Sequence, residues 1–157
     1  MNKSIIGLDK NDSANLVNKL NGLLANFQIY YQNLRGLHWN IKGNNFFELH
    51  AKFEEFYTDS QIKIDDIAER ILTLQGQPLH TFTDYIANAS VPVGKNISKD
   101  IDAVKLVVNS LSELLKIERE ILELSDKADD EGTNAMVSDF IATQEKTIWM
   151  LNSWLGN

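Results

Sequence analysis

The chain has 157 residues, of which 43% are hydrophobic, and a formal net charge of −7. This length predicts one domain, residues 1–157, with enough apolar side chains for a globular core. The acidic balance disfavours binding to polyanions, and the absence of cysteine excludes thiolate metal ligands and thiol catalysis. There is no apolar run of about 18 residues and no signal-peptide core, so we expect a cytoplasmic protein without a membrane-spanning helix.

Hydrophobic residues at helical spacing predict four long helices, which makes the fold all-α. The first helix spans about residues 12–39, beginning at an Asn11-Asp12-Ser13 cluster that is typical of a helix N-cap. Its predicted core stripe comprises Leu16, Leu20, Leu23, Leu24, Phe27, Tyr31 and Leu34.

The second helix spans residues 45–74 and is ended by Gly76 and Pro78. Residues 75–97 are too many for a hairpin turn, and we expect a short helix within them at about residues 83–89. The third long helix begins near Ser98, and the fourth covers about residues 130–155. The sequence therefore predicts a four-helix bundle with one long crossover between its second and third helices.

Five side chains that can bind metal recur at regular spacing in the first half of the chain: His38, His50, Glu54, Asp65 and Glu69. His50 and Glu54 are one helical turn apart and share a face, and Asp65 and Glu69 repeat that relation. The 11 residues from Glu54 to Asp65 make about three turns, so the pairs share nearly the same face but lie roughly 16 Å apart. Metal–ligand bonds measure about 2.0–2.5 Å, so one ion cannot contact both pairs.

An antiparallel two-fold copy of the same helix, paired near Ser60, would resolve this separation. His50 and Glu54 of one chain would face Asp65 and Glu69 of the other, and the symmetry would produce two identical sites. With an imidazole from His38, such a set of ligands suits Fe(II), while Mn and Zn are plausible competitors. The alternative is that the carboxylates are solvated helix charges that happen to align. The metal site is favoured because two of the three histidines lie at this spacing.

Residues 38–71, HWNIKGNNFFELHAKFEEFYTDSQIKIDDIAERI, closely resemble the signature of the Dps family, the mini-ferritins. The matching features are His38-Trp39, Gly43, Phe46-Phe47, His50, the acid at Glu54 and the closing Asp65-x-x-Ala68-Glu69-Arg70. One departure is Glu54, where the family often has Asp, so this carboxylate reaches one methylene further. The resemblance covers most of the chain and implies a ferritin-like four-helix bundle, intersubunit ferroxidase sites and a twelve-chain shell. None of the three histidines follows a Glu by three residues, which disfavours a di-iron site within a single bundle.

The resemblance implies a ferroxidase that oxidises Fe(II), preferably with hydrogen peroxide, and stores Fe(III) mineral as protection against oxidative damage. The alternative is a structural or DNA-protecting oligomer whose metal site is vestigial or holds Zn. Trp39 adjoins His38, so it either donates electrons near the iron or packs at a dimer contact. Arg70 follows Glu69 and either orients the ligand helix through a salt bridge or forms a purely structural pair.

The densest acidic turn lies at residues 125–134. The resemblance implies that it lines a three-fold pore for iron through Asp126, Asp130 and Glu131, where a ring of carboxylates would concentrate cations. Another family acid in this region is replaced by Ala135. The alternative is an ordinary turn whose acids cap the next helix.

DNA binding is expected to be weak or absent. The first twenty residues contain Lys3, Lys10 and Lys19, which are set against Asp9 and Asp12. Twelve chains at −7 each would carry −84, and such a surface repels phosphate.

Overall fold

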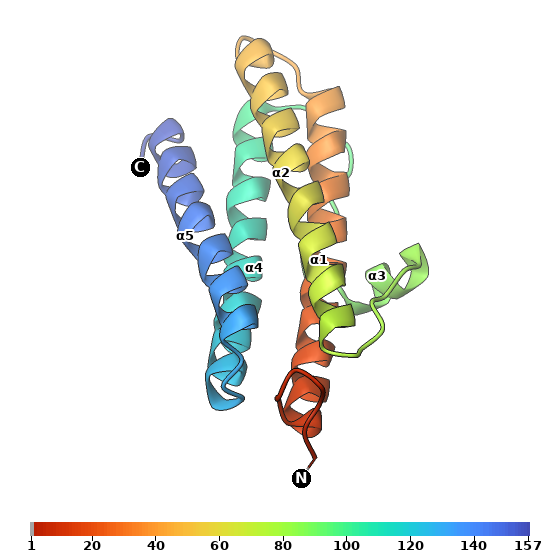
Figure 1. The fold of residues 1–157 in the computed structure, drawn as a ribbon. Coiled ribbons are helices and arrows are strands. Elements are labelled where there is room, and N and C mark those ends of the chain that lie inside the picture. The colour runs from red at the N-terminus through yellow and green to blue at the C-terminus, as the bar shows by residue number, and fades with distance from the viewer. Residues whose placement is uncertain (1) are drawn as a thin grey trace.

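The computed structural model describes residues 2–157, which form five helices. Figure 1 shows α1 beside α2 and α4 beside α5, with α2 and α4 running in the same direction. A long crossover joins these two and carries the short helix α3 along the side of α1. The predicted all-α bundle with a long crossover is therefore confirmed. The helices are α1 (Lys10–Asn40), α2 (Phe46–Thr73), α3 (Phe82–Asn88), α4 (Asp100–Lys127) and α5 (Glu131–Trp154).

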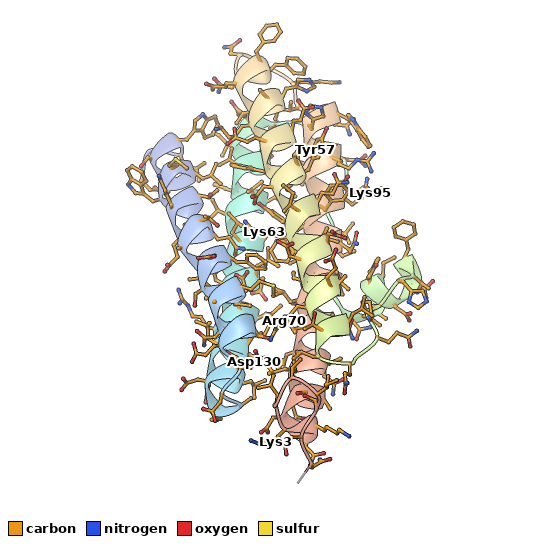
Figure 2. The ribbon with its side chains drawn as sticks, viewed as in Figure 1. Lys3, Tyr57, Lys63, Arg70, Lys95 and Asp130 are labelled. Carbon is orange, nitrogen blue, oxygen red and sulfur yellow. The ribbon has the colours of Figure 1, made fainter. Side chains whose placement is uncertain are left out.

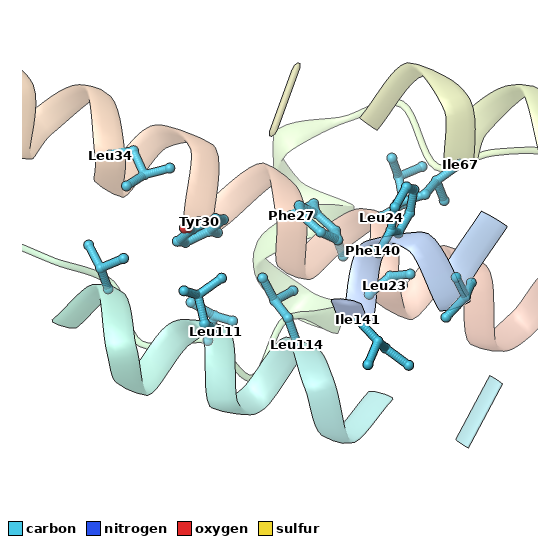
Figure 3. Packing of buried hydrophobic residues seen from close by; sticks show 14 of the residues in the cluster. Leu23, Leu24, Phe27, Tyr30, Leu34, Ile67, Leu111, Leu114, Phe140 and Ile141 are labelled. Atoms are coloured by element: carbon cyan, nitrogen blue, oxygen red, sulfur yellow. The ribbon is translucent and has the colours of Figure 1, made fainter. Parts of the chain in front are cut away.

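Phe27 lies at the centre of the core that the long helices share (Figure 3). Its ring meets those of Tyr30 and Phe140 edge to face, with centroids 6.2 and 6.0 Å away. Such pairs stabilise a core beyond the area that they bury. The predicted stripe of α1 is wrong at one position, because Tyr30 is 4% exposed and Tyr31 is only partly buried. Tyr31 instead faces α2, where it contacts Tyr57.

The N-cap of α1 is Asp9, and the predicted cap at residues 11–13 is wrong. The Asp9 carboxylate accepts hydrogen bonds from the amides of Asn11 at 2.8 Å and Asp12 at 3.2 Å. These amides have no partner within the helix, so the cap satisfies them. Asn11, Asp12 and Ser13 form the first turn of the helix.

Three asparagines on one side of α1 hold the crossover in place. Buried Asn26 accepts hydrogen bonds through Oδ1 from the amides of Ser90 and Val91, both at 2.8 Å. Because a side-chain amide both donates and accepts hydrogen bonds, it can satisfy the backbone N–H and C=O groups of a segment that lies outside any helix or sheet. The other contacts are Asn21 with Gln77 and Leu79, and Asn33 with Pro92 and Gly94.

A polar pair lies inside the bundle between α4 and α5. Glu118 is fully buried, and its Oε2 accepts a hydrogen bond from Gln144 Nε2 at 2.9 Å. Burial raises the pKa of Glu118 to about 8, although the Gln144 hydrogen bond and the charge of Lys63 act in the opposite direction. Desolvation disfavours the charged form of a carboxyl group, so Glu118 is largely protonated at neutral pH.

This pair makes stability depend on pH. Between about pH 4.5 and pH 8 the folded chain keeps a proton on Glu118 that the unfolded chain releases, so the free energy of unfolding falls as pH rises. Glu118→Gln should remove this dependence. Its stability relative to wild type should rise across that window by on the order of 1–4 kcal/mol. Urea unfolding at about pH 5, 6.5 and 8 measures the effect.

Glu123→Gln is the matched control, because Glu123 lies on the same helix with an exposed carboxylate paired to Lys127. It should follow the wild-type pH profile. Parallel profiles for wild type and Glu118→Gln would contradict the assignment.

Candidate metal centre

The two signature histidines lie face to face where α1 ends and α2 begins. The rings of His38 and His50 are stacked, with centroids 3.8 Å apart and planes 9° from parallel. His38 is 8% exposed and His50 is partly buried. The connection between the helices spans only residues 41–45, which keeps the two side chains together.

Each imidazole is hydrogen-bonded to the main chain of the other residue. His38 Nδ1 lies 2.6 Å from the His50 carbonyl oxygen, and His50 Nδ1 lies 2.7 Å from the His38 carbonyl oxygen. A carbonyl oxygen can only accept, so both Nδ1 atoms must carry the hydrogen. In the neutral imidazole the lone pair then lies on Nε2, which is the atom free to bind a metal.

Glu54 follows His50 by one turn, and its carboxylate lies in an aromatic setting. Tyr57 Oη donates a hydrogen bond to Glu54 Oε1 at 3.4 Å. The Tyr57 ring meets His38 edge to face at 5.4 Å, while Phe46 stacks on the outer face of His50 at 4.9 Å. Burial and, secondly, the Glu54 charge raise the pKa of Tyr57, which therefore remains a phenol at neutral pH.

Asp65 and Glu69 form a second pair further along α2, and both are exposed. A hydrogen bond shared between the two carboxyl groups, followed by the negative charge of Asp65, raises the pKa of Glu69. Two carboxylates one turn apart repel each other, and a bound cation would relieve that repulsion.

A single chain supplies two incomplete halves. Across residues 2–157, three or more histidine or acidic side chains nowhere come close enough together to hold one metal ion. The chain brings His38 to His50 and Asp65 to Glu69, and it leaves Glu54 directed at Tyr57. The ligand set predicted from the sequence is therefore present as separate parts.

The ferritin-like domain family matches residues 17–157 of this chain. The chain is 51% identical to a Dps protein of Vibrio cholerae O1, and the two structures superpose with a TM-score of 0.96. The match covers 99% of this chain and 98% of the other. This chain belongs to the Dps family. That relative is described as a member of a broad superfamily of ferritin-like diiron-carboxylate proteins.

Two further relatives agree with this assignment. The DNA protection during starvation protein of Porphyromonas gingivalis is 41% identical, over 96% of this chain and 94% of that protein. A Dps protein of Bacillus brevis is 35% identical, with a TM-score of 0.90, over 92% of this chain and 97% of that one.

The structure of this Dps chain separates the three acids predicted to line a pore. Asp126 and Glu131 are exposed, whereas Asp130 is 2% exposed and caps α5 through a hydrogen bond from the Thr133 amide at 3.0 Å. Its Oδ1 also accepts from Arg70 Nη2 at 2.5 Å (Figure 2). The Asp130 carboxylate is thus occupied inside the fold, whereas the Asp126 and Glu131 carboxylates are exposed, and the pore itself stays a prediction.

Arg70 thus forms a structural pair across helices rather than a bridge to Glu69. Its Nε also donates to Thr133 Oγ1 at 2.9 Å, which ties α2 to the start of α5. A Cβ at Gly132 would lie 2.7 Å from Arg70 Nη1, so a side chain there would force the guanidinium to shift.

Trp39 is 57% exposed, and the Arg35 guanidinium lies over its ring at 4.8 Å. The sequence pattern predicted a functional role for Trp39 but none for Arg35, Tyr31 or Tyr57. The signal for Tyr57 was its position three residues after Glu54, which places both side chains on one helix face. Among residues 2–157, no helix is long and apolar enough to cross a membrane.

Proposed function

We propose that this Dps chain is a cytoplasmic ferroxidase subunit that oxidises Fe(II), preferably with hydrogen peroxide, and stores the Fe(III) mineral in a twelve-chain shell. The observation that carries this proposal is the complementarity of its two half-sites. One offers imidazoles whose Nε2 atoms are free, with Glu54 one turn further, and the other offers the mutually repelling pair Asp65 and Glu69.

A second copy of the chain completes each site in this proposal. Antiparallel pairing of two α2 helices would set His50 and Glu54 of one copy against Asp65 and Glu69 of the other. Two-fold symmetry makes both resulting sites equivalent. His38 contributes through its stack on His50, either as a further ligand or by fixing that ring.

The chemistry follows from these ligands. Carboxylates and imidazoles bind Fe(II) and leave coordination positions open for an oxidant. Two Fe(II) ions give one electron each to hydrogen peroxide, which takes up two protons and becomes two waters. The Fe(III) produced binds oxygen ligands more tightly and hydrolyses to an oxide mineral. Zn and Mn would compete for the same ligands.

Iron retention tests the proposal. Fe(II) and hydrogen peroxide are added without oxygen, and iron that co-elutes with the large assembly is counted. We expect far more iron than ligand sites, with peroxide consumed in step. His50→Ala and Asp65→Ala should each abolish both effects. Unspent peroxide in the wild type, or full activity in both variants, would instead favour a structural or DNA-protecting oligomer with a vestigial or Zn-filled site.

Co-assembly of two inactive chains tests whether the site is shared. One chain carries His50→Ala with Glu54→Ala, and the other carries Asp65→Ala with Glu69→Ala. If ligands come from two copies, every mixed dimer has one intact site, and random mixing should restore about a quarter of wild-type sites. Each chain alone is the matched control and should stay inactive. A mixture that is as inactive as its components would contradict the shared site.

We propose that Asp126 and Glu131 lead iron into the shell. Both carboxylates are exposed at the turn between α4 and α5, where a ring of symmetry copies would attract cations. Asp126→Asn with Glu131→Gln should slow initial Fe(II) uptake by about tenfold at low ionic strength, and less in high salt. Stopped-flow absorbance measures the rate. An unchanged rate would remove these two acids from the entry route.

Asp130→Asn is the control for this experiment. This substitution should lower stability, because the loss of charge weakens the buried ion pair with Arg70. Removing one partner of such a pair typically lowers the free energy of unfolding by about 3–5 kcal/mol. Its thermal unfolding midpoint should fall while the salt dependence of uptake persists.

Weak DNA binding is the remaining part of the proposal. The basic N-terminal residues do not extend freely, because residues 2–9 fold back on the start of α1. The Lys10 amide donates to the Asn2 carbonyl at 2.9 Å, and the backbones of Lys3 and Asp9 pair in an isolated antiparallel β-bridge. Figure 2 shows Lys3 beside the first turn of α1. The acidic chain then offers little to bind phosphate.

We expect no band shift of duplex DNA at about 0.15 M salt. The same chain with a lysine-rich extension at its N-terminus is the positive control, and it should shift DNA in a salt-dependent way. A clear shift by the unmodified protein would contradict the expectation.

A further inference from the structure

A cavity of about 240 Å³ lies between α2 and α5, and none of the five candidate iron ligands lines it. Figure 2 shows Lys63, one of the lining residues, in the middle of α2 on the side toward α5. An apolar cavity of about 150 Å³ is large enough to take up benzene. The volume between α2 and α5 therefore suffices for a six-membered ring with a small substituent.

The inner wall of this cavity is largely aromatic. Phe27 and Tyr30 contribute to it from α1, and Phe56 contributes from α2. Phe27 is 1% exposed and Tyr30 is 4% exposed, so these rings lie deep in the bundle. Figure 3 shows Tyr30 opposite Leu111 of α4, which also lines the cavity. Because aromatic rings attract one another through edge-to-face and offset contacts, this wall favours a ligand with an aromatic body.

A buried hydrogen-bond acceptor at the cavity has no partner in the protein. Gln144 lines the cavity and is 3% exposed, yet its Oε1 receives no hydrogen bond from residues 2–157. The other end of this amide is already used, since Nε2 donates to Glu118 Oε2 at 2.9 Å. Glu118 Oε1 has no partner within the same residues either. A buried acceptor without a donor is unfavourable, so a ligand that donates a hydrogen bond would be stabilised there.

The charged side chains around the cavity neutralise one another. Lys63 Nζ lies 2.5 Å from Asp59 Oδ2, and Lys52 Nζ lies 2.9 Å from Glu55 Oε2. These four residues are the only charged ones that line the cavity. An ionised ligand would lose its water without gaining an unpaired opposite charge. The lining therefore selects a neutral ligand.

We propose that this cavity binds small phenols, with the aromatic ring against the inner wall and the hydroxyl donating to Gln144 Oε1. A hydroxyl also accepts a hydrogen bond, which the Lys63 ammonium can supply because it has three hydrogens. Binding requires no metal, so the inference goes beyond the proposed ferroxidase activity and does not rest on it. A bound phenol would contact both α2 and α5 and would stabilise the folded chain.

A ligand-observed NMR titration of the assembled protein with phenol tests the site. Phenol should bind saturably, one molecule per chain, with a dissociation constant on the order of 1 mM or lower. Toluene has the ring without the donor and should bind about three- to tenfold more weakly. Benzoate is charged and should not compete with phenol. Equal affinity for phenol and toluene would overturn the hydroxyl contact.

Two variants locate the binding. Gln144→Met removes the acceptor at similar size and should reduce the affinity for phenol to that for toluene. Thr147→Phe fills the cavity from α5 and should abolish binding of both compounds. Gln77→Met is the matched control, because Gln77 is exposed in the crossover, and it should bind phenol as the wild type does.

Cooperative thermal unfolding of each variant shows whether it folds. Thr147→Phe and the comparison with toluene decide the question even if Gln144→Met is unstable. Absence of saturable phenol binding in the wild type would overturn the inference, since Gln144 Oε1 would then be satisfied by water or by Glu118. Phenol binding that Thr147→Phe leaves unchanged would place the site elsewhere and overturn it as well.

Discussion

The rise of one helix is the constraint on which the candidate centre depends. α2 keeps His50, Glu54, Asp65 and Glu69 on one face, but roughly 16 Å separates the two pairs along its axis. A metal–ligand bond is no longer than about 2.5 Å, and within residues 2–157 no three of the candidate ligands come together around one ion. Under the proposed function, chemistry at this centre is therefore a property of an assembly. In that case a chain that failed to pair would keep its fold and lose the site.

The histidine pair joins the candidate centre to the architecture of the bundle. The carbonyl groups in the last turn of α1 have no partner within the helix. His50 Nδ1 donates a hydrogen bond to one of them, the carbonyl oxygen of His38. The reciprocal bond fixes the His38 ring against α2. One arrangement thus closes a helix end and selects the tautomer that exposes Nε2. The ring positions are set by the corner between α1 and α2 before any ion binds, so little reorganisation is needed on binding.

Much of the fold could be predicted from the sequence, because long helices with apolar stripes and a proline-containing crossover have strong periodic signals. The boundaries of α2 and α3 lie within one residue of their predicted positions. The asparagine contacts to the crossover could not be predicted, since Asn26 and its partner amides are more than 60 residues apart and asparagine has no distinctive spacing. The burial of Tyr30 rather than Tyr31 depends on small rotations of α1 against its neighbours, which periodicity does not resolve. The spacing of the candidate ligands along the helix is visible in the sequence, whereas the hydrogen bond between Glu54 and Tyr57 depends on their side-chain conformations.

The end of the signature, Glu69-Arg70, shows why one short motif can serve both chemistry and folding. Consecutive residues on a helix project about 100° apart, so neighbours in sequence face different surroundings. Glu69 is exposed on the ligand face, while the Arg70 side chain reaches inward to Asp130 and Thr133 at the start of α5. Burial then decides what each acid can do. Asp130 is held by an arginine, a backbone amide and a hydroxyl, and it has no access to a passing cation. Asp65 and Glu69 are exposed to solvent next to each other, as the proposed iron site requires.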